Sequence, residues 1–298
     1  LVSQIENTTG RRISLIDLFQ GRTIEDITSG PEWTSDELPR AVSPIRAQGT
    51  LTPFFAIGSH PGYLEMSKRI NIEQPVYRLD VYALQSKRLS QSLSAYKNIE
   101  QITAEFADHI QSLQPQGPYI IGGGCEGALT AFSIATELQQ RGEEIAELIL
   151  WITPAPNYGG GAVFGRSAPF RVVGQLKSLF RRARISDMNF RMIMELIKHE
   201  YIEHKIFRSM DNFQPLRKFK GEIILARTVE NRHSWDTDLA MGWSEHATAG
   251  VKVYELEGNH ETWLVNYAQE FGDLLESRLK RVRTTQTVVK TEERPSIP

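Results

Sequence analysis

The sequence predicts an α/β fold in which a mostly parallel sheet carries helices on both faces. Short, continuously apolar segments alternate along the chain with longer segments of helical periodicity. The apolar segments lack the alternation of polar and apolar residues that a half-exposed sheet shows. With 298 residues, 40% of them hydrophobic and 23% charged, the chain can bury one large core with a small appendage.

The expected strands lie at residues 54–57, 75–79, 119–121, 148–152, 222–226 and 251–256; most are apolar runs, whereas 75–79 and 251–256 follow a strand pattern that includes charged residues. A helix is expected at 98–113, because its apolar residues recur every three or four positions along one face. The long helix expected at 128–141 stops at Gly142, a residue that commonly ends helices. A last amphipathic helix is expected at 265–279.

The remaining segments define the expected domain organisation. Residues 1–29 hold short helical groups broken at Gly10 and Gly21, and residues 30–51 form an expected linker with three prolines. The main domain is expected at 52–280, with a helical lid inserted at about 157–216. The polar tail 281–298 is expected to be disordered.

Composition excludes several classes of function. A net charge of −2 gives no field that would gather phosphates, so no nucleic acid is expected as a partner. The apolar runs are far shorter than a bilayer span, and no signal peptide is visible, so a cytoplasmic location and no membrane contact are expected. A single cysteine excludes an intrachain disulfide framework and a cysteine-based zinc cage, and no metal is expected.

The central motif is Gly123-Gly124-Cys125-Glu126-Gly127, which lies between an expected strand and an expected helix. In the α/β-hydrolase fold the nucleophile occupies such a tight turn, and the residues two positions away must be nearly free of side chains. Gly123 and Gly127 meet this need. The helix N-terminus favours a thiolate and lowers the thiol pKa, so Cys125 is the expected nucleophile. A purely structural cysteine beside a glycine-rich turn is the alternative.

The partners of Cys125 follow from chain order. His260 lies between the last expected strand and the last expected helix, where this fold places its general base. The Glu126 N–H is one expected oxyanion donor, and the His60 N–H is the favoured second donor.

The acid is the open member of the catalytic set. The strand 148–152 ends at Ile152 without a carboxylate, so the loop after residues 222–226 is the other location. This loop offers Glu230, Asn231, Asp236 and Asp238, of which Glu230 is favoured, with Asp236 as the alternative. A thiol of lowered pKa depends less on a third member than a serine does.

These residues resemble the thioesterase domains that end nonribosomal peptide and polyketide synthases. The likeness covers about residues 52–279 and rests on QPQGPY at 114–119, on the glycines at 122–127, on Gly242-Trp243 and on Gly258-Asn259-His260. Residues 1–29 are similar to the last helices of a carrier domain, in ISLIDLF at 13–19 and TIED at 23–26. The family usually has serine at the position of Cys125 and aspartate at that of Ile152.

The resemblance implies an enzyme that releases an acyl or peptidyl chain from the phosphopantetheine thioester of a carrier domain. Release would pass through an acyl group on Cys125, and then through hydrolysis, cyclisation or transfer. No cofactor is expected to bind directly, and the long apolar lid suggests a sizeable lipophilic or peptidyl substrate. The alternatives are a stand-alone editing thioesterase of type II and a degenerate domain that only docks a carrier.

Overall fold

A seven-stranded sheet forms the centre of the molecule. The computed structural model describes residues 41–58, 62–81, 84, 98–124, 126–156, 158, 214–229, 238–258 and 268–292. The strands lie in the order β1-β3-β2-β4-β5-β6-β7; β1 runs antiparallel to β3, and every other neighbouring pair is parallel. A mostly parallel sheet with helices on both faces is the α/β-hydrolase arrangement that the sequence predicts.

The strand positions agree closely with the apolar runs. The strands are β1 (Val42–Arg46), β2 (Phe54–Ile57), β3 (Val76–Leu79), β4 (Tyr119–Gly124), β5 (Ile145–Trp151), β6 (Ile223–Thr228) and β7 (Val251–Leu256). The central strands β2, β4 and β6 are buried along their whole length, as parallel strands covered on both faces must be. Six of these strands were predicted, and the prediction missed β1.

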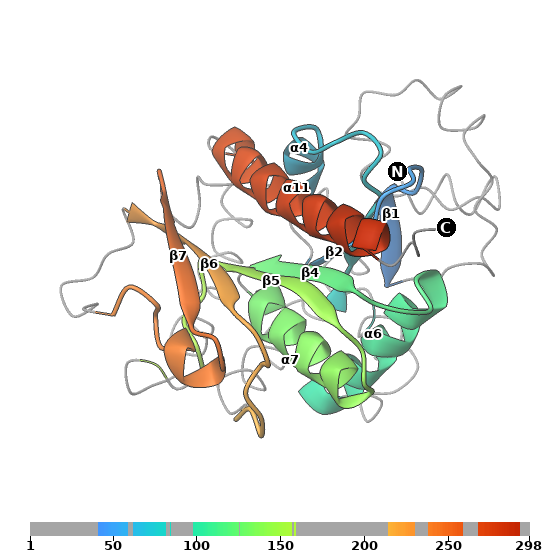
Figure 1. The fold of residues 1–298 in the computed structure, drawn as a ribbon. Coiled ribbons are helices and arrows are strands. Elements are labelled where there is room, and N and C mark those ends of the chain that lie inside the picture. Colours follow the sequence, from blue (N-terminus) through green and yellow to red (C-terminus); the bar gives the residue numbers. More distant parts are fainter. Residues whose placement is uncertain are drawn as a thin grey trace, which may run out of the picture.

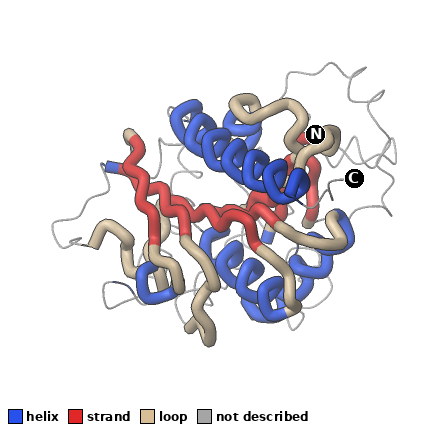
Figure 2. The backbone as a smooth tube through the Cα atoms, viewed as in Figure 1, coloured by secondary structure: helices blue, strands red, loops and turns tan. Residues whose placement is uncertain are grey.

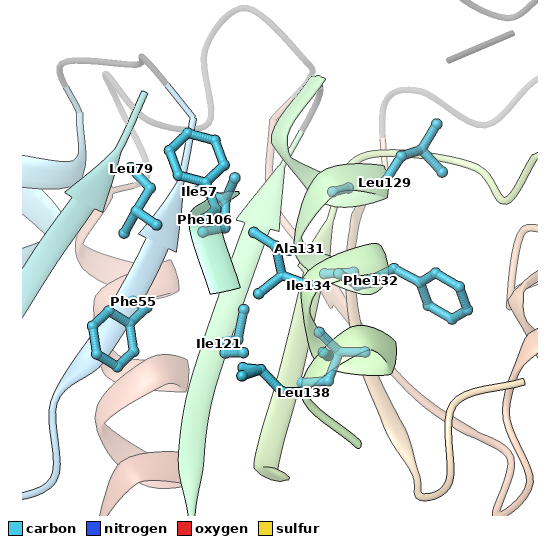
Figure 3. Packing of buried hydrophobic residues seen from close by; sticks show 14 of the residues in the cluster. Phe55, Ile57, Leu79, Phe106, Ile121, Leu129, Ala131, Phe132, Ile134 and Leu138 are labelled. Carbon is cyan, nitrogen blue, oxygen red and sulfur yellow. The ribbon is translucent and has the colours of Figure 1, made fainter. Parts of the chain in front are cut away.

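Helices cover the two faces of the sheet in pairs. In Figures 1 and 2, α6 (Ile99–Leu113) and α7 (Glu126–Gln140) lie on one side, and α4 (Tyr63–Ser67) and α11 (Ala268–Glu292) lie on the other. Side chains alternate between the two faces along each strand. Phe55, Ile57 and Ile121 pack towards α6 and α7 (Figure 3), whereas Phe54 and Ile120 belong to the core beneath α4 and α11.

Local sequence explains the ends of the helices. Asn98 caps α6: its side chain accepts a hydrogen bond from the Gln101 N–H, and the Gln101 side chain accepts one from the Asn98 N–H. After α7, Gly142 takes a left-handed backbone conformation with φ 87°, which favours glycine.

A buried ion pair ties α11 to the sheet. Arg278 on α11 donates hydrogen bonds of 2.8 and 2.9 Å from Nη2 to the two carboxylate oxygens of Glu147 on β5. The two side chains are only 6% and 7% exposed. Burial raises the pKa of Glu147, and the hydrogen bonds and charge of Arg278 offset part of that effect.

Two of the expected domain boundaries differ from the structure. The strand β1 lies inside the expected linker 30–51, so the sheet begins before residue 52. The helix α11 runs to Glu292, well into the expected disordered tail 281–298. The expected carrier-like helices at 1–29 and nearly all of the expected lid at 157–216 lie outside the described residues. Within the described part of the chain, no helix is both long enough and apolar enough to cross a bilayer.

Candidate active site

The chain passes from β4 to α7 through a single intervening position, residue 125, and we call this turn, residues 123–127, the elbow. The strand ends at Gly124 and the helix starts at Glu126. A Cβ atom added at Gly123 would overlap the carbonyl oxygen of Gly127, and one added at Gly127 would overlap the carbonyl oxygen of Ile57 at the end of β2. The strand, the helix and the neighbouring strand therefore approach closely enough here to exclude side chains at both glycines.

The other two glycines of this run pack against Trp151. An added Cβ at Gly122 would lie 2.8 Å from the indole Cζ3 of Trp151, and one at Gly124 would overlap its Nε1. Trp151 is the last residue of β5 and is fully buried. Glycine is therefore required at the three successive positions for two separate reasons. Gly123 leaves room for the backbone of α7, and Gly122 and Gly124 leave room for the Trp151 indole.

The backbone at Gly58, the residue that follows β2, is held by a hydrogen bond to the neighbouring strand. Gly58 has φ 133°, which favours glycine, and its N–H donates a 2.9 Å hydrogen bond to the carbonyl oxygen of Leu79. This N–H is therefore engaged in the sheet and is not available to an oxyanion. Further along the chain, the hydroxyl of Tyr63 donates a 2.9 Å hydrogen bond back to the Ile57 carbonyl oxygen.

The end of β5 carries no acidic side chain. Ile152 is 8% exposed and has φ 54°, a left-handed conformation that is rare for a β-branched residue. Its N–H donates a 2.9 Å hydrogen bond to the Ala226 carbonyl oxygen.

The loop after β6 offers acids, but one of them has a structural role. The Asp238 carboxylate accepts hydrogen bonds from the N–H groups of Ala240, at 2.9 Å, and Gly242, at 2.7 Å. The buried Arg227 donates a 3.2 Å hydrogen bond to the Leu239 carbonyl oxygen. The carboxylate of Asp238 thus shapes the turn at the end of this loop.

Most of the side chains expected to perform chemistry lie outside the described residues: Cys125, His260, His60, Glu230 and Asp236. Glu126 is described only as the first residue of α7. His246 lies far from the elbow, because its carbonyl oxygen accepts a hydrogen bond from Phe219, just before the start of β6. Its ring packs against Phe132 and Trp243, and burial lowers the pKa of His246.

Sequence reasoning missed Tyr63 and Trp151. The signal for Trp151 was present, since a tryptophan ends one apolar run while three glycines end the run before it. No local pattern marks Tyr63. Among the residues that the structure describes, no group of three His, Cys, Asp or Glu side chains could hold a metal ion.

The family described as "Thioesterase domain" matches residues 53–279. The chain belongs to the thioesterase domain family. Its members release chains bound as thioesters, so this thioesterase is an enzyme.

The curated relatives of the thioesterase are synthetases much longer than this chain. It is 32% identical over 136 residues to "Nonribosomal peptide synthetase apvA" of Aspergillus terreus, covering 45% of this chain and 14% of that protein. It is 31% identical over 186 residues to "Chondramide synthase cmdD" of Chondromyces crocatus, covering 59% of this chain and 4% of that protein. The thioesterase therefore spans only a small part of the relatives that it matches.

A solved structure supports the fold. The NocB thioesterase domain from the nocardicin cluster superposes with a TM-score of 0.62 at 16% identity, covering 81% of this chain and all of that one. At this level of identity the likeness concerns the fold alone.

Proposed function

We propose that this thioesterase releases an acyl or peptidyl chain from the phosphopantetheine arm of a carrier domain, with Cys125 as the nucleophile. The observation that carries the proposal is the turn from β4 to α7. It leaves one residue between strand and helix, and the neighbouring backbones exclude side chains at Gly123 and Gly127. Such a turn exposes the side chain of its central residue at the carboxyl edge of the sheet.

The proposed first step exchanges one thioester for another. The Cys125 thiolate attacks the carbonyl carbon of the substrate and forms a C–S bond, and the carbonyl oxygen becomes an oxyanion. As the tetrahedral intermediate collapses, the bond to the pantetheine sulfur breaks. His260, which took the proton from Cys125, returns a proton to the departing thiolate.

The second step frees the chain. His260 removes a proton from water, or from an amine or hydroxyl group of the bound chain, and this nucleophile attacks the acyl carbon. The bond to Cys125 breaks and the thiol is restored. Hydrolysis gives an acid and internal attack gives a ring. A thioester on cysteine keeps the acyl carbon more electrophilic than an oxoester on serine.

The oxyanion donors and the acid are assigned from their positions along the chain. The Glu126 N–H lies at the N-terminus of α7, where backbone donors and the helix dipole favour negative charge. The His60 N–H is the second proposed oxyanion donor, in keeping with the engagement of the preceding Gly58 N–H in the sheet. Glu230 is the proposed acid, with Asp236 as the alternative.

The carrier domain and the substrate class are inferred from the family. Relatives named as nonribosomal peptide synthetases support a carrier domain as the partner. A lipophilic or peptidyl thioester is the proposed substrate, and the pantetheine arrives with the carrier, so no cofactor is bound directly.

Intact-protein mass spectrometry with acyl N-acetylcysteamine thioesters tests the proposal. We expect the wild type to gain the mass of the acyl group, Cys125→Ala to gain none, and His260→Ala to be impaired in turnover. Cys125→Ser is the matched control, because it keeps a nucleophilic side chain at this position and replaces the sulfur by the oxygen that is usual in the family. An adduct that persists in Cys125→Ala would refute the assignment of the nucleophile.

A further inference from the structure

Tyr63 connects the start of α4 to the end of β2, the strand next to β4. It is the first residue of α4 and only 2% exposed. Its hydroxyl donates to the carbonyl oxygen of Ile57, the last residue of β2. The same carbonyl oxygen occupies the space that a side chain at Gly127 would need, so it is held between Tyr63 on one side and the start of α7 on the other.

The ring of Tyr63 extends this link to the residue before the nucleophile. It meets the indole of Trp151 edge to face, with the centroids 5.8 Å apart. The Nε1 of Trp151 in turn occupies the space next to Gly124, where an added Cβ would overlap it. The Tyr63 hydroxyl also lies 2.7 Å from the position of an added Cβ at Gly58.

We propose that Tyr63 is a positioning residue for the oxyanion hole, acting through its hydrogen bond to the Ile57 carbonyl oxygen and its contact with Trp151. The inference rests on the proposed function. One oxyanion donor is assigned to the N-terminus of α7 and the other to the segment that begins after Gly58. The stabilisation of an oxyanion depends on how accurately both donors are placed. The end of β2 is paired with Gly123 of β4, and the Tyr63 hydroxyl adds a side-chain hydrogen bond that fixes the Ile57 carbonyl group beside the elbow.

Removing the hydroxyl while keeping the ring isolates this role. Tyr63→Phe deletes one hydrogen bond and leaves the packing against Trp151 in place. Tyr119→Phe is a matched control, because the buried Tyr119 also donates from its hydroxyl to a backbone carbonyl, that of Gln114 at 3.0 Å. Tyr119 begins β4, so it lies at the opposite end of this strand from the elbow.

Two reactions of Cys125 separate positioning from general damage. Acylation by a thioester needs the oxyanion hole, whereas alkylation by iodoacetamide needs only the thiolate. In Tyr63→Phe we expect the acylation rate constant to fall about 10- to 100-fold. We expect KM and the alkylation rate to stay within about twofold of the wild type. Tyr119→Phe should keep both reactions within about twofold.

Either of two results would overturn the proposal: acylation by Tyr63→Phe at the rate of the wild type, or equal falls in acylation and alkylation. Amide hydrogen exchange gives a test that does not depend on activity. The Gly58 amide should exchange about tenfold faster in Tyr63→Phe than in the wild type or in Tyr119→Phe. Equal exchange in all three proteins would refute the link, whereas a wild type that no thioester acylates would refute only the proposed function.

Discussion

Replacing Arg278 by methionine should destabilise the domain strongly, because it leaves Glu147 buried without its ionic partner. The pair shares hydrogen bonds of 2.8 and 2.9 Å, and both side chains are less than a tenth exposed. Breaking a buried pair by removing one member costs about 3–5 kcal/mol. We therefore expect Arg278→Met to lower the free energy of unfolding by about 4 kcal/mol at pH 8.

The loss should depend on pH in a defined direction. Burial raises the pKa of Glu147 above its usual value of 4.5, and the contact with Arg278 offsets part of this rise. In Arg278→Met the offset is gone, so the pKa rises further. A carboxyl group with a raised pKa in the folded state contributes stability that is complete below its unfolded pKa and is lost as pH rises through the folded pKa. The gap between wild type and variant should therefore narrow as pH falls from 8 towards 4.5.

Burial alone would lower the pKa of Arg278, but the hydrogen bond and the attraction to Glu147 outweigh it and raise the pKa. The guanidinium thus stays charged over the whole range, and the pH dependence belongs to Glu147.

Urea unfolding at pH 5 and pH 8 measures both effects. The double variant Glu147→Leu/Arg278→Met removes both charges and should recover stability to within about 1 kcal/mol of the wild type. Lys68→Met is a control for an exposed pair, since Lys68 and Glu65 are 58% and 55% exposed, and it should cost less than about 1 kcal/mol. A small loss in Arg278→Met at pH 8, or no recovery in the double variant, would refute the reasoning.

Three further predictions concern the elbow, the end of β5 and the acid. Gly124→Ala should cost about 3 kcal/mol in urea unfolding because its Cβ would overlap the Trp151 indole. A Cβ added at Gly142 would have no atom within 4 Å, so Gly142→Ala should lower the free energy of unfolding by only about 1 kcal/mol, because of its positive φ. Equal losses in the two variants would contradict the close packing of Gly124 against Trp151. Ile152→Gly should be about 1 kcal/mol more stable than Ile152→Ala, because glycine tolerates φ 54° and alanine does not; the reverse order would argue against strain. Glu230→Gln should slow the acylation of Cys125 about 10- to 100-fold and Asp236→Asn less than about twofold, and the opposite pattern would reassign the acid.

Continuous apolar runs made the centre of the fold predictable. The expected strand 54–57 coincides with β2, and the expected helix 98–113 differs from α6 only by its cap, Asn98. The strand β1 was missed because it contains Pro44 and because residues 43–46 are only half-buried, so the segment shows no continuous apolar run. The extent of α11 was missed because its last turns are polar.

The candidate site was predictable only where one short motif contains it. The glycines at 123 and 127 could be assigned from local sequence, since the turn itself demands them. The contacts of Trp151 with Gly124 and with Tyr63 join residues far apart in the chain, and no periodicity encodes such pairs. Asp238 illustrates the same limit: as a sequence position it is one acid among several, and only its hydrogen bonds to Ala240 and Gly242 show that it shapes a turn.

The position of α11 has a consequence for how the domain is made. Phe271, Leu275 and Leu279 cover strand residues that include Phe54 and Ile149, which are synthesised long before the helix. During translation only the short helix α4 can cover this face of the sheet, among the described helices, until α11 has left the ribosome. Contacts of such large sequence separation form late and slow folding. Before α11 is made, the nascent sheet therefore exposes much of this apolar surface, which chaperones can bind, and the core on this face is completed when α11 packs against it.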